Sequence, residues 1–571
     1  MHIVRTLTLI ATLVSSAAHA ADRHAQVDAL FAPWTGTATP GCAVAIRQAG
    51  TPDYVRSYGM ASLEYGVPIT PDSIFHVASI SKQFTAFAIG LLAQEGKLSL
   101  DDDIRKHVPE LPDFGHTVTI AQMLHHTAGL REEFHLLYLA GWHYDDPRTE
   151  ADALRISARQ RALNFAPGTE SLYTNSHYTL LAIVVQRVSG TPLREFAHER
   201  IFRPLGMTDT HFQDGHTEVV RRRATGYSAG AAGTWRTNVP RSDLVGPSNL
   251  LTTVGDLLKW EQNLIDARVG GRTLIDWMKT SATLNDGEET GYGAGLRIER
   301  YRGVRAVSHD GADAGYRADA VTFPDQQLTI VALCNGASIA PGVLTRKIAD
   351  IYLGDRLSPA MPPVVQVPEM ELSALAGVYW SEVSDEIVRL EVKDGALRPV
   401  GSPDPLVPIG ARVFGVSGQA HEWRFSAAVP ASGAGAAANA PIELRIRDFW
   451  PKPRIFTRLT APLPSASVLA SFAGEYRSDE TDMTYTARVE NGKLSLRWAR
   501  GSALTLEAVG GDHFIDGIYI VTFTRSPSGE VDGLTISTRR VRRLRADRLA
   551  APSGRLTAQR YRVRETGRGL Q

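Results

Sequence analysis

Residues 75–82 read Phe75-His76-Val77-Ala78-Ser79-Ile80-Ser81-Lys82, and they lead into a run of apolar residues at helical spacing. This spacing predicts a helix that begins near Ser79 and carries Lys82 on the same face, one turn further on. A hydroxyl in that position lies close to an amine that can take its proton, as an activated serine nucleophile requires. The alternative is a serine that caps the helix and a solvated lysine.

Two further motifs stand at the ends of expected elements. Tyr173-Thr174-Asn175 comes directly before a second amphipathic helix, and His309-Asp310-Gly311 precedes a strand-rich stretch that ends at Asn335-Gly336. Their order behind the serine and lysine favours the catalytic interpretation of residues 79–82 over the capping one.

Together these motifs resemble the β-lactamase-related serine hydrolases. That family includes class C β-lactamases, DD-carboxypeptidases and other DD-peptidases, D-aminopeptidases, and serine esterases of the lactamase type. The resemblance covers roughly residues 27 to 355. Besides Ser79-Lys82, Tyr173-Asn175 and His309-Gly311, it is carried by Leu124-His125-His126-Thr127-Ala128-Gly129-Leu130, Pro167-Gly168, Pro204-Leu205-Gly206-Met207 and Tyr292-Gly293-Ala294-Gly295-Leu296.

The resemblance implies an α+β fold, in which an antiparallel sheet flanked by helices lies beside a helical subdomain, with the nucleophile at their junction. It implies Ser79 as the acylated nucleophile, Lys82 as the acceptor of its proton, and Tyr173 as a shared general base and acid. Asn175 would orient Lys82 and the substrate. The backbone N–H groups of Ser79 and Ala312 would form the oxyanion hole. Neither a metal nor another cofactor is required.

The third motif departs from the penicillin-recognising pattern. β-Lactamases carry Lys-Thr-Gly or Lys-Ser-Gly, which hold a substrate carboxylate, where this chain has His309, Asp310 and Gly311 as its substrate-binding segment. If Asp310 faces the site, it opposes a carboxylate at ~4 Å by about 4 kcal/mol at an effective dielectric of about 20; if it points away, the penalty disappears. A histidine in the first position resembles D-aminopeptidases and lactamase-type esterases, which argues against efficient β-lactamase activity.

The second part of the chain repeats itself. From about residue 370 short strands and turns replace the mixed pattern, and Gly377 and Gly474 head similar segments that are 97 residues apart. This pattern predicts two small antiparallel β-barrel domains. The expected organisation is a signal peptide over 1–20, a hydrolase domain over 21–357, a proline-rich linker over 358–370, β-barrels over 371–461 and 465–550, and a basic flexible tail over 551–571.

This three-part layout resembles D-aminopeptidases, in which the second barrel sends a loop toward the active site. The segment with Asp479, Glu480, Asp482 and Met483 is a candidate for that loop, and a solvated hairpin is the alternative. Near the end of the second barrel, a run of arginines is expected along a last strand as a solvated face. These arginines are Arg539, Arg540, Arg542, Arg543, Arg545 and Arg548.

Composition excludes several classes of partner. Lys and Arg total 61 and Asp and Glu total 61, so no net field attracts nucleic acid, and no apolar run reaches the ~18 residues of a membrane span. Residues 1–20 combine a polar start, an apolar run and Ala18-His19-Ala20, which is typical of a cleavable secretory signal. A periplasmic or secreted protein is therefore expected.

Cys42 and Cys334 are interpreted as small buried residues, with a disulfide between them as the alternative.

The leading hypothesis is an exported serine hydrolase that acts on a small molecule or peptide, most simply a D-amino-acid derivative, through an acyl-enzyme. A lactamase-type carboxylesterase or a DD-carboxypeptidase is the alternative. A catalytically silent ligand-binding protein on the same fold is the alternative outside enzymes. The sequence leaves the oligomeric state open, with a homodimer among the candidates.

Overall fold

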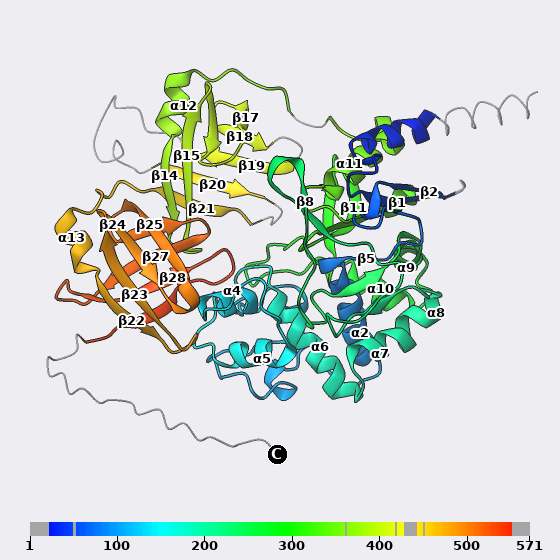
Figure 1. Ribbon diagram of the computed structural model, residues 1–571, viewed down its shortest axis with the longest axis horizontal. Helices are drawn as coiled ribbons and strands as arrows, with labels where there is room; N and C mark the ends of the chain where they lie inside the picture. Colours follow the sequence, from blue (N-terminus) through cyan, green and yellow to red (C-terminus); the bar gives the residue numbers. More distant parts are fainter. Residues whose placement is uncertain are drawn as a thin grey trace, which may run out of the picture.

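The computed structural model describes residues 22–49, 53–359, 362–416, 419–426, 442–448 and 452–550. The expected signal peptide over 1–20 and the expected basic tail over 551–571 lie outside these residues. A mixed helix and sheet part, which contains the Ser79 motif, lies beside two β-barrels (Figure 1). The domain boundaries given above stay predictions.

A six-stranded antiparallel sheet forms the centre of the first part. Its spatial order brings the N-terminal strands against strands from almost 300 residues later in the chain. The strands, in spatial order, are β10 (Arg297–Tyr301), β11 (Val304–Asp313), β12 (Tyr316–Phe323), β13 (Leu328–Cys334), β1 (Cys42–Gln48) and β2 (Tyr54–Tyr58).

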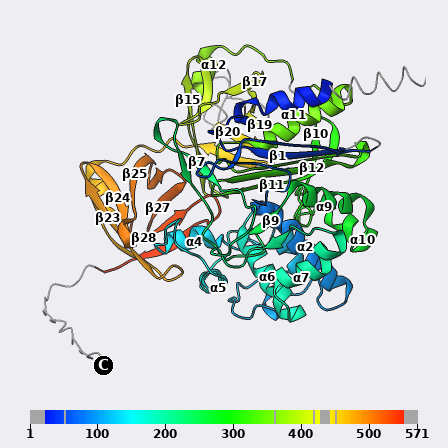
Figure 2. The ribbon, with the colours of Figure 1, turned by 45° about the vertical axis from the view of Figure 1, so that its right-hand side comes forward.

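Both faces of the sheet are buried. Successive side chains of a strand point to opposite faces, so each strand contributes to both cores. In β1, Val44 and Ile46 pack into one core, whereas Ala43 and Ala45 pack into the other. One face is covered by α11 (Pro341–Leu353) and a helix over residues 22–30, and the other by α9 (Val254–Asp266) and α2 (Ser81–Gln94). Figure 2 shows the sheet between these two layers.

A helical region lies beyond α2. Its longest helix, α6, packs along α2 and is buried over most of its circumference. The predicted α+β fold, with a helix-flanked antiparallel sheet beside a helical region, is confirmed. The helices of this region are α3 (Ile120–Leu124), α4 (Glu133–Leu139), α5 (Glu150–Ala158), α6 (Asn175–Ser189) and α7 (Leu193–Ala197).

Two eight-stranded antiparallel units make up the rest of the described chain, as predicted. The first is a sheet whose end strands β16 and β17 follow each other in sequence, and the second is a closed barrel. The first contains β14 (Gly377–Ser381), β15 (Glu386–Lys393), β16 (Ala396–Pro399), β17 (Leu406–Gly410), β18 (Val413–Val416), β19 (Gln419–Phe425), β20 (Glu443–Arg447) and β21 (Arg454–Arg458). The second contains β22 (Gly474–Ser478), β23 (Met483–Glu490), β24 (Lys493–Arg497), β25 (Ala503–Gly510), β26 (His513–Asp516), β27 (Tyr519–Arg525), β28 (Val531–Ser537) and β29 (Leu544–Arg548).

The repeat has a shared structural basis. The Tyr379 hydroxyl donates to the Leu375 carbonyl at 2.8 Å, and the Tyr476 hydroxyl donates to the Phe472 carbonyl at 2.7 Å. In each unit the buried tyrosine ties the first strand to the short helix before it. The repeated sequence pattern therefore encodes the same closure of a barrel end twice.

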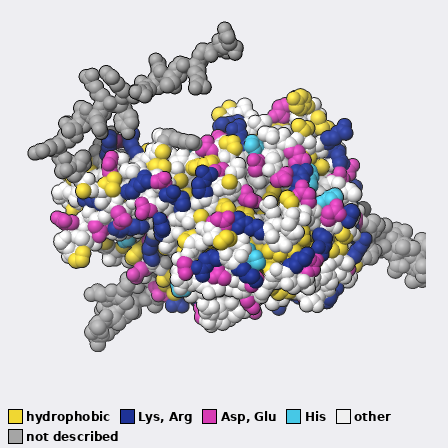
Figure 3. Space-filling model, turned by 90° about the horizontal axis from the view of Figure 1, so that it is seen from below, with side chains coloured by type: hydrophobic (Ala, Val, Ile, Leu, Met, Phe, Trp, Pro, Cys, Tyr) yellow, Lys and Arg dark blue, Asp and Glu magenta, His cyan; other side chains and the backbone are white. Residues whose placement is uncertain are grey.

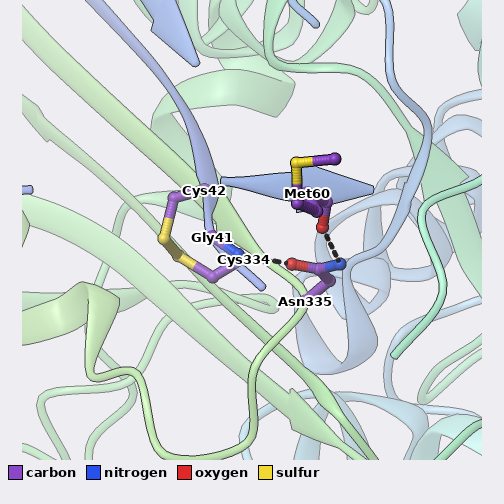
Figure 4. Close-up of a disulfide and its surroundings, with 5 residues drawn as sticks. All are labelled: Gly41, Cys42, Met60, Cys334 and Asn335. Atoms are coloured by element: carbon purple, nitrogen blue, oxygen red, sulfur yellow. Dashed lines mark hydrogen bonds between the residues drawn. A yellow bond between two sulfur atoms is a disulfide. The ribbon is translucent and has the colours of Figure 1, made fainter. Parts of the chain in front are cut away.

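Cys42 and Cys334 form a disulfide between the neighbouring strands β1 and β13. Both are fully buried, as expected, and the alternative that the sequence left open, a disulfide, is the one found. Directly beside it, the Asn335 side chain accepts from the Gly41 N–H at 2.8 Å and donates to the Met60 carbonyl at 2.9 Å (Figure 4). A disulfide and two hydrogen bonds thus join the N-terminal segment that contains β1 and β2 to the end of β13.

The closed barrel packs directly on the helical region. Leu136, Leu137 and Leu139 of α4 belong to the same apolar cluster as the barrel core, and the Tyr485 hydroxyl donates to the Leu139 carbonyl at 2.9 Å. A surface view from below shows acidic and basic side chains intermingled (Figure 3), which fits the balanced composition. Within the described residues, the helices are too short or too polar to cross a membrane.

Candidate active site

Ser79 lies on a tight turn at the junction of sheet and helical region. A 3₁₀ turn, η2 (Ala78–Ile80), precedes α2, and Ala78 has a φ of 47°, which non-glycine residues rarely adopt. The Ser81 hydroxyl holds this conformation, because it donates to the Ala78 carbonyl at 2.6 Å and accepts from the Leu250 N–H at 3.1 Å. The turn aims Ser79 away from the helix and into a cavity, a strained arrangement typical of functional sites.

Lys82 is fully buried one turn after Ser79, so the alternative of a solvated lysine is wrong. Its Nζ donates to Ser79 Oγ at 3.2 Å, Asn175 Oδ1 at 2.8 Å and the Pro247 carbonyl at 2.9 Å. Burial lowers the pKa of Lys82 to about 7, against the raising effect of Glu132 and with the help of Arg540. An amine with this pKa is partly neutral near pH 7 and can accept a proton.

Asn175 is held in place by Glu132, a residue that the sequence analysis missed. The buried carboxylate of Glu132 accepts from the Asn175 backbone N–H at 2.7 Å and from its side-chain Nδ2 at 3.0 Å. Because the amide nitrogen faces Glu132, the amide oxygen faces Lys82. Glu132 therefore fixes the orientation of the Asn175 side-chain amide, with its oxygen toward Lys82.

Tyr173 lies between Lys82 and the second barrel. Lys82 Nζ is 4.7 Å from the centre of its ring, and the Arg540 guanidinium is 5.0 Å from the same centre. Burial raises the pKa of Tyr173 above its usual value, while the nearby Ser79 hydroxyl and Arg540 oppose the rise. Its buried hydroxyl makes no hydrogen bond of ordinary geometry in the described chain. The phenol is thus protonated and available to a substrate.

His309 and Asp310 of β11 form the opposite wall. His309 Nε2 is 2.9 Å from the Tyr292 hydroxyl, and burial lowers the pKa of His309 to about 3, so the imidazole is neutral. Asp310 lines the cavity and pairs with Arg297 at 2.7 Å. Asp310 therefore faces the site with its charge compensated, so the 4 kcal/mol penalty of a bare carboxylate does not apply.

Gly311 brings β11 against the serine turn. A Cβ at this position would lie 2.1 Å from the Val77 carbonyl oxygen, a separation that no side chain tolerates. Only glycine permits the approach, which places the next residue, Ala312, on the cavity wall with Ser79. Two backbone N–H groups on converging segments can receive a developing oxyanion.

The resulting cavity has a volume of about 310 Å³ and is closed by all three parts of the chain. The first barrel unit adds His421 and Asp448, and the closed barrel adds Arg540. The remaining lining residues are Ser79, Tyr173, Arg297, His309, Asp310 and Ala312.

Arg540 comes from residues 538–543 between β28 and β29, named the arginine loop below. The Arg540 carbonyl accepts from Glu132 N–H at 3.3 Å and from Asn164 Nδ2 at 3.0 Å. The Arg542 N–H donates to Asn164 Oδ1 at 2.8 Å, and Arg131 donates to the Arg542 carbonyl at 2.9 Å. These contacts clamp the loop to the helical region.

The prediction that all six arginines lie along a last strand is therefore partly wrong. Arg545 and Arg548 lie on β29, but Arg539, Arg540, Arg542 and Arg543 lie in the arginine loop. Arg542 is buried, and its charge is compensated by an ion pair with Glu170 at 2.9 Å.

The segment that was expected to reach the site does not line this cavity. Glu480 is buried in an ion pair with Arg131, while Arg159 donates to the Asp479 and Glu480 carbonyls. Asp479–Met483 thus anchors the barrel beside the site instead, and the solvated-hairpin alternative does not describe Glu480 either.

Sequence reasoning missed Glu132, Arg297 and Arg540. Glu132 follows the Leu124–Leu130 motif and precedes a second glutamate, Glu133, so an acidic pair at the start of a helix was its only local signal. Arg297 follows the Tyr292–Leu296 motif directly. Arg540 had no local signal beyond the charge run, because its partner Glu132 is 408 residues away.

Comparisons with known proteins point to one family. A model of the family described as Beta-lactamase matches residues 27–352. A D-aminopeptidase of Gluconobacter oxydans is 27% identical over 460 residues, which cover 80% of this chain and 82% of that protein. Penicillin-binding protein 4* of Bacillus subtilis is 28% identical over 297 residues, which cover 49% of this chain and 65% of that protein. The match to the D-aminopeptidase of Gluconobacter oxydans is longer than the part of the chain before the barrels, so it extends into the barrels.

Two solved structures share the fold. The octameric penicillin-binding protein homologue from Pyrococcus abyssi superposes with a TM-score of 0.54 and 23% identity, and covers 76% of this chain and 99% of that one. SurE superposes with a TM-score of 0.51 and 19% identity, and covers 93% of this chain and 100% of that one. At these identities, the likeness shows the fold alone.

Proposed function

Because this chain is a serine hydrolase that belongs to the β-lactamase family, we propose that it forms an acyl-enzyme through Ser79 on the amide bond of a small peptide or D-amino-acid derivative. The observation that carries the proposal is the partly buried contact of 3.2 Å between Lys82 Nζ and Ser79 Oγ, beside the Tyr173 hydroxyl. Nucleophile, proton acceptor and proton donor are thus assembled without further rearrangement.

Acylation follows from the pKa values of these groups. Neutral Lys82 takes the Ser79 proton while Oγ attacks the carbonyl carbon, and the carbonyl oxygen becomes an oxyanion held by the N–H groups of Ser79 and Ala312. Removing one such donor typically costs about 100- to 1000-fold in rate. As the C–N bond breaks, the leaving amine takes a proton from Tyr173, which regains one from the Lys82 ammonium. Water then hydrolyses the ester by the reverse use of the same groups.

Glu132 and Arg540 act in this scheme as positioning residues. Glu132 orients the Asn175 amide toward Lys82, and Arg540 lies 3.5 Å from the Glu132 carboxylate and over the Tyr173 ring. Their opposite charges pull the Lys82 pKa in opposite directions. The closed barrel, through Arg540, is thereby part of the machinery that keeps Lys82 partly neutral.

The substrate class is inferred from the relatives and the third motif. The D-aminopeptidase likeness extends over 80% of the chain, and a neutral histidine stands where penicillin-recognising enzymes carry a lysine. An exported location is proposed with it. The Cys42–Cys334 disulfide supports that location, because disulfides persist in oxidising compartments.

A DD-carboxypeptidase is the second candidate. Arg297 and Arg540 both line the cavity and could hold a terminal carboxylate, and penicillin-binding protein 4* is among the relatives. The two candidates differ in which end of the substrate is free, so substrates with one blocked end separate them.

The test compares the mature protein with its Ser79→Ala variant. A fluorophosphonate probe should label the native protein and not the variant, and turnover of D-alanine p-nitroanilide should disappear with Ser79. Turnover of an N-blocked D-alanyl-D-alanine peptide instead would favour the carboxypeptidase, and turnover of short p-nitrophenyl esters alone would favour the esterase. Folded native protein that takes no label would contradict the acyl-enzyme proposal.

A further inference from the structure

A second, larger cavity lies where the three parts of the chain meet. Its volume is about 1020 Å³, above the ~300–1,000 Å³ typical of small-molecule pockets. The first barrel unit, the closed barrel and the segment before Tyr173 all contribute to its walls.

Apolar side chains that remain accessible to solvent line this cavity. Val383 is 67% exposed, Ile455 44%, Val400 41% and Ile518 40%. Large apolar side chains gathered in one concave region, rather than scattered singly, mark a binding site. Trp423 adds a half-buried aromatic surface to the same wall.

The cavity adjoins the Ser79 site on the Tyr173 side. Asp448 lines both cavities, Leu172 precedes Tyr173, and Arg539 precedes Arg540. In the proposed mechanism Tyr173 protonates the leaving amine. The large cavity therefore lies next to the leaving-group side of the scissile bond.

We infer that this cavity binds the apolar leaving-group segment of a peptide substrate several residues long. The inference rests on the proposed function and specifies its substrate class. The Ser171 hydroxyl and the exposed side chains of Glu289 and Arg539 stand among the apolar side chains and can pair with peptide amides. This mixture suits a peptide better than an alkyl chain, which offers no hydrogen-bonding groups.

The experiment measures kcat/KM for D-alanyl peptides with one to four apolar residues after the D-alanine. We expect kcat/KM to rise at least tenfold along the series. Ile518→Asp, at a 40% exposed position, should abolish this rise and leave turnover of D-alanine p-nitroanilide unchanged. Val489→Asp is the matched control, because Val489 is also 40% exposed but lies on β23 outside the cavity, and it should keep the rise.

A flat series in the native protein, or an equal loss of all substrates in Ile518→Asp, would overturn the inference. A gain for p-nitrophenyl octanoate over the acetate without a gain along the peptide series would replace the peptide by an alkyl chain and also overturn it. Calorimetric binding of the longest peptide to Ser79→Ala supplies a readout without turnover. Binding that Ile518→Asp weakens about tenfold would support the cavity even if the acyl-enzyme proposal failed.

Discussion

Replacement of Arg540 by methionine should move the pH dependence of catalysis to higher pH. The Arg540 guanidinium and Lys82 Nζ lie 5.0 and 4.7 Å from the centre of the same Tyr173 ring, so the two cations are within about 10 Å of each other. At an effective dielectric of ~20, like charges at ~10 Å repel by about 1.7 kcal/mol, or roughly 1.2 pKa units. Arg540 is about a third exposed, and solvent screening reduces this to roughly half a unit to one unit.

The sign follows from the protonation state that reacts. In the proposed mechanism neutral Lys82 accepts the Ser79 proton. Arg540 lowers the pKa of Lys82, so the loss of Arg540 raises that pKa above about 7. The acidic limb of kcat/KM, which reports the free enzyme, should therefore shift to higher pH by that amount. Activity should fall about 3- to 10-fold near pH 6 and little above pH 9.

Glu132→Gln should shift the same limb in the opposite direction, because the Glu132 carboxylate raises the Lys82 pKa. Four other groups also act on Lys82, and among them the pKa of Glu133, raised by burial and by Glu132 to about 8, falls when Glu132 is replaced, which reduces the shift expected for that variant. The four groups are Glu133 and Asp310, whose charges act on Lys82, and Tyr173 and Tyr178, whose rings contact it.

Kinetics over pH 5–10 with D-alanine p-nitroanilide provide the assay. Arg540→Lys should keep the native limb, and Arg497→Met, an exposed arginine at the end of β24, controls for loss of a barrel arginine. If Arg540→Met lowers kcat/KM equally at every pH, or moves the limb to lower pH, the electrostatic role of Arg540 is refuted.

Three further outcomes are expected. Tyr173→Phe should lower kcat for amides by about 100- to 10,000-fold, as loss of a general acid does, and should affect esters of good leaving groups much less, which steady-state kinetics can compare. Gly311→Ala should lower acylation by Ser79 at least about 100-fold, because its methyl would lie 2.1 Å from the Val77 carbonyl oxygen; labelling rates with the fluorophosphonate probe measure this, and a native rate would refute the close approach. Replacement of both Cys42 and Cys334 by alanine should reduce the free energy of unfolding by about 2–4 kcal/mol, and denaturant titration should show a lower midpoint; an unchanged midpoint would mean that the bond adds no stability.

The family, the fold class and the motif-bearing part of the site could be predicted because their signals are local. Ser79 and Lys82 are three residues apart, and Tyr173 and Asn175 stand at the start of one helix, so each motif is a short local segment that the family resemblance identifies. The two barrels were predictable for the same reason, since alternation along a strand and the 97-residue repeat need no knowledge of distant contacts.

Tertiary structure decided the rest. Whether Asp310 carried a bare charge depended on Arg297 in the neighbouring strand, and whether the cysteines paired depended on the register of β1 against β13, across 292 residues of sequence. The arginine loop meets Glu132 across 408 residues, through the packing of the closed barrel on α4. The sequence by itself predicted that Ser79 and Lys82 lie close together, because residues three apart share one face of a helical turn. Only the packing of separate elements determined the charges around them, because Coulomb interactions depend on proximity in space and not on position along the chain.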